Sequence, residues 1–209
     1  ARCVNASCPA QLKQGIIHFG SQEALDVDGL GEKTVDQLVD RGMVEDFADL
    51  FDLTVEQVAS LDRMAQKSAQ NLVNAVEKSR ERVTLPRLVY GLGIPHVGRA
   101  AAEDLARAFG SLNRLAAAKV SDLEALSGMG ITMAQAISDW FTVEKNQRLL
   151  KRLREKGLDP KTRGRGDRLE GLTVVITGEL ESMTRDEAEA AVRAQGGNPT
   201  SSVSGNTDY

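Results

Sequence analysis

Aromatic residues are scarce in this sequence, which has one Trp, two Tyr and five Phe among 209 residues. So few large rings favour small helices that pack through Leu, Val and Ala rather than a core built around aromatic clusters. Apolar residues make up 41% of the chain and charged residues 27%. This composition is typical of a globular protein with one or two domains.

Long hydrophobic runs are also lacking. No apolar stretch approaches the roughly 20 residues that a membrane-spanning helix needs. The first residues, Ala1-Arg2-Cys3-Val4, have neither the apolar core of a signal peptide nor an initiator Met. We therefore expect an excised or processed piece of a longer chain.

Cysteine occurs only at Cys3 and Cys8. This C-x4-C pair has the spacing of one half of a structural zinc site, but tetrahedral zinc needs four ligands. The nearby imidazole of His18 would not complete the set. The alternative is a pair of idle or disulfide-forming thiols. On the zinc interpretation, the other two ligands would precede residue 1.

A net positive charge is absent too, because the formal net charge is −4. The charges are nevertheless clustered: residues 25–56 contain ten acids and two bases, whereas residues 63–119 contain ten bases and four acids. Residues 144–168 again contain ten bases and four acids. A polyanion would be attracted to the two basic windows. The alternative is that these charges only solvate helix faces.

A short turn motif is present four times, at offsets of 34, 33 and 32 residues. Its copies are Asp28-Gly-Leu-Gly-Glu-Lys-Thr34, Asp62-Arg-Met-Ala-Gln-Lys-Ser68, Pro95-His-Val-Gly-Arg-Ala-Ala101 and Ser127-Gly-Met-Gly-Ile-Thr-Met133. A single glycine pair between helices is usually only a cap. Four copies at nearly constant spacing instead indicate a repeat architecture.

The motif predicts a tight turn between two helices. Glycine tolerates positive φ and lets another molecule approach the backbone closely. The N–H groups at the start of the following helix favour anions such as phosphate. In the second copy, Arg63 and Ala65 replace the two glycines, and in the third His96 replaces the first.

A longer repeat relates the copies in pairs. Four apolar residues before the second turn match four before the last at an offset of 65: Leu50, Val55, Val58 and Leu61 with Leu115, Val120, Leu123 and Leu126. Capping boxes at Thr54–Gln57 and Ser121–Glu124 predict the start of a helix in each pair. We therefore expect a mainly α fold with four helix-hairpin-helix motifs in two pseudo-symmetric pairs.

The character of the chain changes near its C-terminal end. Residues 158–168 are basic and Gly-rich, which is typical of a linker. Beyond them we expect a strand at 172–178, a helix at 185–194 capped by Thr184, and a second strand starting at 202–204. Roughly 40 residues with one strand and one helix do not bury a stable sheet core. We therefore expect a truncated α/β segment.

Several local sequences together resemble the carboxy-terminal half of a bacterial NAD-dependent DNA ligase, over essentially the whole chain. They are Arg2–Gln11, Asp26–Lys33, Lys67–Leu72, Gly93–Gly98 and Ile176–Leu180. The resemblance implies the second half of a four-cysteine zinc finger at 1–20 and a helix-hairpin-helix domain at 21–157. A basic linker at 158–168 and a truncated BRCT-like segment at 169–209 would follow.

The implied function is sequence-independent binding of nicked duplex DNA by a monomeric, cytoplasmic, nucleoid-associated ligase that seals nicks in replication and repair. The expected DNA-binding residues are Gly29, Gly31, Lys33, Lys67, Gly98, Arg99, Gly128 and Gly130. Cys3 and Cys8 would bind zinc, and Thr177 and Gly178 would form a phosphate pocket. The second hairpin, without its glycines, would bind weakly or serve packing, and the third and fourth would contribute more than the first.

No catalytic residue is expected in this chain. The adenylated lysine of such ligases lies in a Lys-x-Asp-Gly motif, and Asp26–Gly29 lacks that lysine. The sites for NAD and magnesium would belong to an upstream part, so this segment alone would be inactive.

Two other functions compete with this interpretation. A free-standing repair scaffold could use the same hairpins without an adenylation domain. A nucleotide enzyme could use Val174–Gly178 or Gly91–Gly93, but neither is a G-x-G-x-x-G motif after a strand. His96 could act as a catalytic base, although a lone turn histidine more often has a hydrogen-bonding or packing role.

Overall fold

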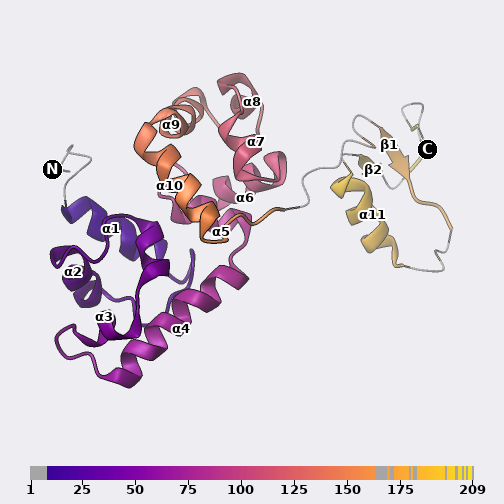
Figure 1. The fold of residues 1–209 in the computed structure, drawn as a ribbon. Coiled ribbons are helices and arrows are strands. Elements are labelled where there is room, and N and C mark those ends of the chain that lie inside the picture. The colour runs from indigo at the N-terminus through magenta and orange to yellow at the C-terminus, as the bar shows by residue number, and fades with distance from the viewer. Residues whose placement is uncertain are drawn as a thin grey trace.

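A computed structural model describes residues 9–162, 169, 172–178, 180, 183–195, 197–200, 202–203, 205 and 207–208. The chain is mainly helical up to residue 155 and then forms a small α/β part (Figure 1). The helices are α1 (Pro9–Phe19), α2 (Glu32–Asp40), the 3₁₀ helix η1 (Phe47–Asp52), α3 (Val55–Ala59), α4 (Gln66–Arg82), α5 (Leu85–Gly91), α6 (Arg99–Phe109), α7 (Leu112–Ala116), α8 (Val120–Glu124), α9 (Ile131–Thr142) and α10 (Glu144–Glu155). They are followed by β1 (Thr173–Val175), α11 (Arg185–Ala194) and β2 (Asn198–Thr200).

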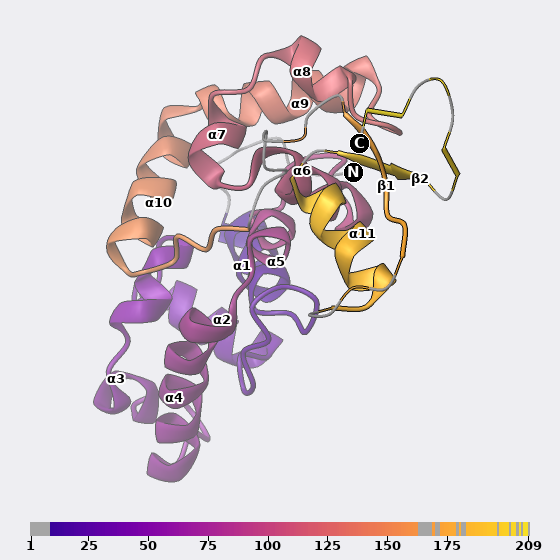
Figure 2. The ribbon, with the colours of Figure 1, turned by 90° about the vertical axis from the view of Figure 1, so that its right-hand side faces the viewer.

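The four expected hairpins are confirmed. Helix α1 packs on α2, α3 on α4, α5 on α6, and α8 on α9. The first two hairpins form the indigo-to-purple half of the helical part, and the last two form the pink-to-orange half (Figure 1). Contacts of α5 with α1, and of α10 with η1, join the two halves. Figure 2 shows α10 extending from the second half toward the first.

The pseudo-symmetry predicted from the 65-residue offset is also confirmed. Helices α3 and α8 have five residues each and begin at positions 55 and 120, while α4 and α9 begin at 66 and 131. Leu50 and Leu115 are both 2% exposed, and Val58 and Leu123 are both fully buried. The two halves therefore bury equivalent residues in equivalent places.

The buried apolar residues of the helical part form one continuous cluster that extends from Ile16 to Leu158. Helix α1, within the segment 1–20, contributes Ile16 and Phe19 to this cluster, and α10 contributes Leu150 and Leu153. Burying a side chain of this size stabilises a fold by about 1.5–3 kcal/mol. Both helical halves are thus parts of one core.

Several helix boundaries follow from local sequence. Thr54 caps α3 in a capping box with Gln57, as the sequence predicts, and Gly110 ends α6 at φ 70°. The prediction of a capping box at Ser121 is wrong, because α8 begins at Val120 and Ser121 lies inside it. The Asp122 carboxylate accepts the N–H of Lys119 at 3.0 Å instead.

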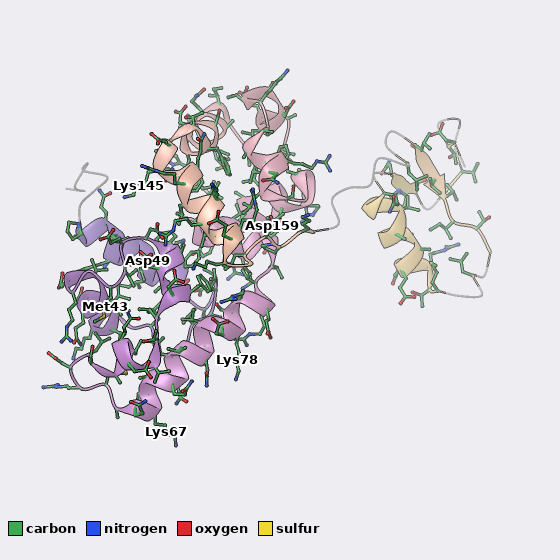
Figure 3. The ribbon with its side chains drawn as sticks, viewed as in Figure 1. Met43, Asp49, Lys67, Lys78, Lys145 and Asp159 are labelled. Atoms are coloured by element: carbon green, nitrogen blue, oxygen red, sulfur yellow. The ribbon has the colours of Figure 1, made fainter. Side chains whose placement is uncertain are left out.

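Ion pairs connect α10 to η1 across the two halves. The Arg152 guanidinium donates to Asp49 at 2.7 Å and also to Asp46, and Lys156 pairs with Asp52. Figure 3 labels Asp49 at this junction. The basic window 144–168 therefore neutralises part of the acidic window 25–56. Some of the positive charge visible in the sequence serves the fold and is not available to a polyanion.

The C-terminal part contains two parallel strands, with Thr173 opposite Asn198 and Val175 opposite Thr200. Thr184 caps α11, and its N–H and hydroxyl groups donate to the Glu187 carboxylate, which lowers the pKa of Glu187. The expected first strand is shorter than predicted, and the second lies at 198–200 rather than at 202–204. This difference arises because pairing with β1, rather than β-branched composition, decides which residues become a strand.

Candidate nucleic-acid interface

The four hairpin turns share one backbone geometry. In each turn an N–H donates to the carbonyl three residues earlier: Leu30 to Val27 at 3.3 Å, Met64 to Leu61 at 3.2 Å, Val97 to Ile94 at 3.1 Å and Met129 to Leu126 at 3.1 Å. The third residue of each turn has positive φ: Gly29 at 86°, Arg63 at 60°, His96 at 68° and Gly128 at 78°. This combination is that of a type II β-turn.

After the turn, one residue packs inward and the next caps a helix. The caps are Gly31, Ala65, Gly98 and Gly130, all in extended conformation and without a side-chain cap hydrogen bond. All four caps and the residues that immediately follow them are exposed. The first N–H groups of α2, α4, α6 and α9 are therefore available to a ligand from outside.

The glycines of the motif have two different roles. Gly29 and Gly128 adopt the positive φ that the turn requires. Gly31, Gly98 and Gly130 have ordinary φ values, and a Cβ added at any of them would meet no atom within 4 Å. The second glycine of the motif thus leaves space for an external ligand, and the backbone conformation at that position does not require glycine.

The second hairpin keeps this geometry without either glycine. The N–H of Asp62 donates to Gln37 Oε1 at 2.7 Å, and Gln37 Nε2 donates back to the Asp62 carbonyl at 3.4 Å. Arg41 donates to the Ser60 carbonyl and to the Asp62 carboxylate, both at 2.7 Å. Gln37 on α2 and Arg41 at its C-terminal cap therefore fix a turn that has glycine in the first and fourth copies.

Three of the expected DNA-binding residues carry positive charge. Lys33 and Lys67 are exposed, and neither has an ion-pair partner within 4.0 Å among the residues that the structure describes. Figure 3 shows Lys67 at the turn end of α4. Both lysines are the second residue of their helix, next to the exposed N–H groups.

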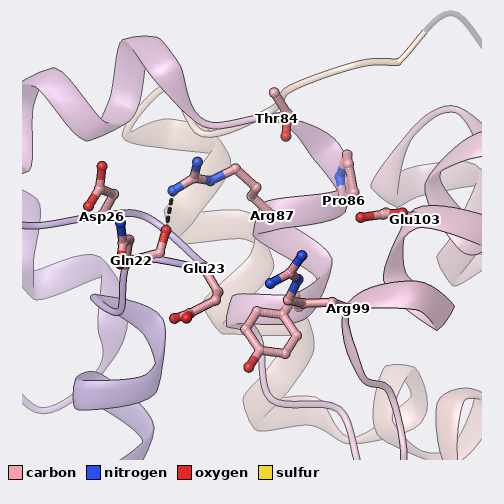
Figure 4. Close-up of a pocket in the computed structure, with 9 residues that line it drawn as sticks. Gln22, Glu23, Asp26, Thr84, Pro86, Arg87, Arg99 and Glu103 are labelled. Atoms are coloured by element: carbon pink, nitrogen blue, oxygen red, sulfur yellow. Dashed lines mark hydrogen bonds between the residues drawn. The ribbon is translucent and has the colours of Figure 1, made fainter.

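Arg99, the first residue of α6, has a more mixed environment. It lines a polar cavity of about 590 Å³ together with the carboxylates of Glu23 and Glu103 (Figure 4). Arg87 also lines this cavity, but its guanidinium donates to the Gln22 carbonyl at 2.6 Å (dashed in Figure 4) and so holds the segment between α1 and the first turn. Of these two cations, only Arg99 has no hydrogen-bond or ion-pair partner in the part of the chain that the structure describes.

His96 does not belong to a catalytic constellation. It is exposed at the tip of the third turn, and no hydrogen bond in the described part of the chain connects it to an acid or a nucleophile. Its positive φ shows what it does in the fold, because it occupies the turn position that glycine has in the first and last copies.

The remaining expected site residues lie elsewhere. Thr177 and Gly178 are exposed just after β1, with Gly178 at φ 80°. Cys3 and Cys8 lie outside the described residues, so the half-zinc site stays a prediction. Within the described ranges, no group of three or more His, Cys, Asp or Glu side chains is placed to hold a metal ion. None of the described helices is long and apolar enough to cross a membrane.

Comparison with known families agrees with this geometry. Residues 21–78 match the family described as a SAM-like helix-hairpin-helix tandem, and residues 87–150 match the helix-hairpin-helix motif family. Residues 164–209 match the BRCA1 C Terminus (BRCT) domain family. The chain therefore combines two helix-hairpin-helix pairs with a BRCT segment.

Curated relatives match this chain over its whole length. The chain is 47% identical over 210 residues to a DNA ligase of Carboxydothermus hydrogenoformans, which covers 100% of this chain and 32% of that protein. It is 48% identical to a DNA ligase of Desulfosudis oleivorans and 49% identical to one of Alkalilimnicola ehrlichii, covering 31% and 32% of those proteins. Over its whole length the chain is therefore similar to a segment of DNA ligases, and it spans about a third of the length of these relatives.

Proposed function

We propose that this chain is the duplex DNA-binding segment of an NAD-dependent DNA ligase. In this proposal it is a monomer, acts in the bacterial cytoplasm on nucleoid DNA and holds nicked double strands. The single observation that carries the proposal is the fourfold repetition of an exposed, uncapped helix N-terminus directly after the same turn.

Backbone N–H groups at a helix N-terminus recognise phosphate and carry no information about base sequence. Flanking cations such as Lys33, Lys67 and Arg99 add affinity that falls as salt concentration rises. The open space beside Gly31, Gly98 and Gly130 is what close approach of a phosphate requires. The hairpins would therefore grip the duplex backbone from the minor-groove side without selecting sequence.

The chemistry of nick sealing would lie outside these residues. No Lys-x-Asp-Gly sequence is present in the chain, so the lysine that takes AMP from NAD, and the magnesium that assists it, would be supplied by another part of the ligase. Cys3 and Cys8 would provide two thiolates of a four-ligand zinc site. This segment alone is expected to bind DNA without sealing it.

The double variant Gly98→Val plus Gly130→Val tests the hairpin contacts. Because a Cβ at either position meets no protein atom within 4 Å, we expect the fold to accommodate the valines and the added side chains to obstruct an external ligand. We expect a loss of affinity for a fluorescent nicked duplex, measured by anisotropy, of about tenfold or more, with unchanged helical circular dichroism.

A matched control adds the same two valines away from the turns, as Ala116→Val plus Ala117→Val at the exposed end of α7. This control should bind like the unmodified chain. If the glycine variant also bound nicked duplex normally, the hairpin contacts would not hold DNA and the proposal would be wrong.

A further inference from the structure

We infer that Arg63 binds a DNA phosphate together with Lys67, and that the second hairpin is therefore the most cationic of the four backbone contacts. This inference rests on the proposed function and adds a residue and a hairpin to it. It reverses the expectation that the second copy, without its glycines, binds weakly. Three observations support it.

The first observation is the position of Arg63. It is the third residue of its turn, at φ 60°, where the first and last turns have glycine. Positive φ is unfavourable for a side chain such as arginine and persists only where the surroundings impose it. Here the bonds from Gln37 and Arg41 to the turn impose it. The structure thus maintains an exposed arginine at a turn tip where glycine would be relaxed.

The second observation is the charge balance of the four turns. In the second turn Asp62 is already paired with Arg41 at 2.7 Å. Arg63 and Lys67 are exposed, and neither has an ion-pair partner within the described ranges. The second hairpin therefore presents two unneutralised cations.

The other turns present less positive charge. In the first, Asp28 and Glu32 outnumber Lys33, and in the fourth, residues 126–133 contain no charged side chain. The third offers Arg99, whose neighbours include the carboxylates around the 590 Å³ cavity. The second turn is the most basic, although the first copy is the clearest motif in the sequence.

The third observation is where the two cations lie relative to the helix. Arg63 precedes the Ala65 cap and Lys67 is the second residue of α4, so they flank the exposed N–H groups between them. Helix α4 has 17 residues, and Ala65 offers no side-chain cap hydrogen bond. A phosphate at this point would meet the helix N-terminus, a guanidinium with paired donors and an ammonium group.

The variant Arg63→Gly tests this inference. Glycine prefers the positive φ of the turn, so the variant should be at least as stable to urea as the unmodified chain. Its affinity for a nicked duplex should fall about three- to tenfold at low salt. The slope of log K against log salt concentration should become less steep by about 0.9, the value for one lost phosphate contact.

Two further variants separate this contact from general charge. Lys78→Gln removes an exposed cation from the same helix; Figure 3 labels both lysines on α4. At the rise of an α-helix, Lys78 lies about 16 Å along the axis from Lys67. This variant should leave affinity and salt slope nearly unchanged. Arg63→Lys keeps the charge and should retain most of the salt slope.

The outcomes distinguish the two proposals. If the unmodified chain does not bind duplex DNA, the proposed function fails. If it binds and Arg63→Gly binds equally well with the same salt slope, the assignment of Arg63 is wrong. Equal losses in Arg63→Gly and Lys78→Gln would also overturn it, because the effect would then come from net charge alone.

Discussion

The guanidinium of Arg152 donates a 2.7 Å hydrogen bond to the carboxylate of Asp49, although 103 residues separate the two in the chain. Arg152 lies on the last helix of the second hairpin pair, and Asp49 lies on η1 in the first pair. The contact therefore joins the two pseudo-symmetric halves at a point where their sequences differ. By joining the halves, it also helps to hold the two hairpin pairs in place relative to each other.

Breaking this contact should destabilise the helical part. Arg152→Gln leaves Asp46 and Asp49 partly buried without their cation, and we expect a loss of about 1–2 kcal/mol in the free energy of unfolding. Arg148→Gln on the same helix is the matched control, because its partner Glu144 is 3.8 Å away and both side chains are well exposed. The control should change stability by less than about 0.5 kcal/mol in urea titrations. Equal losses in the two variants would show that the contacts of Arg152 with Asp46 and Asp49 stabilise the fold no more than an exposed ion pair does.

The same contact predicts a dependence on pH. Burial tends to raise the pKa of Asp49, but bonds from Arg152 and from the N–H groups of Glu45 and Asp46 outweigh burial and hold it below the ordinary 3.8. The stabilisation is therefore complete above pH 3.8 and is lost as pH falls through the lower folded pKa. The difference in unfolding free energy between the unmodified chain and Arg152→Gln should shrink below pH 3.8. A constant difference down to pH 2 would contradict this assignment.

Gly20, which follows α1, lies too close to the first turn to accept a methyl group. A Cβ at Gly20 would lie 2.6 Å from Leu30 Cδ2, whereas a Cβ at Gly31 would meet nothing within 4 Å. Gly20→Ala should destabilise the chain by about 1–3 kcal/mol through overpacking. Gly31→Ala should remain within about 1 kcal/mol of the unmodified chain. Thermal unfolding followed by circular dichroism compares the two, and the prediction fails if both midpoints are equal.

The pseudo-symmetric helices α3 and α8 offer a comparison of their caps. The Thr54 hydroxyl accepts the N–H of Gln57 at 3.2 Å, whereas Lys119, at the equivalent position, provides no side-chain cap. Thr54→Ala should cost about 0.5–2 kcal/mol, and Lys119→Ala less than about 0.5 kcal/mol. Denaturant titration measures both. A loss at Lys119 as large as the loss at Thr54 would contradict the assignment of a side-chain cap to Thr54 alone.

The sequence predicted the features of the fold that depend on neighbouring residues. The Thr54 cap and the turn position of Gly29 follow from capping chemistry and the φ freedom of glycine. Internal repetition predicted the two hairpin pairs, because apolar residues that recur at the same spacing are expected to be buried at equivalent positions in each pair. The family resemblance and the matched families agree with this architecture.

The sequence was less informative where a distant residue decides. Nothing local shows that Gln37 and Arg41 would hold the second turn in the glycine conformation, so Arg63 was not among the predicted site residues. Nor does composition show that Arg152 and Lys156 neutralise acids more than 100 residues away. Hydrogen bonds and ion pairs form between groups that the fold brings together, whatever their separation along the chain.

The sequence by itself therefore determined the type and number of the hairpins, and it identified the first as the clearest copy. Only the tertiary structure decided which hairpins present free positive charge, because each cation is available or neutralised according to its neighbours in space. Among the described residues Lys67 has no ion-pair partner, Arg87 holds the segment between α1 and the first turn, and Arg152 joins the two halves. These three cations look alike in the sequence and differ only in what the folded chain places beside them.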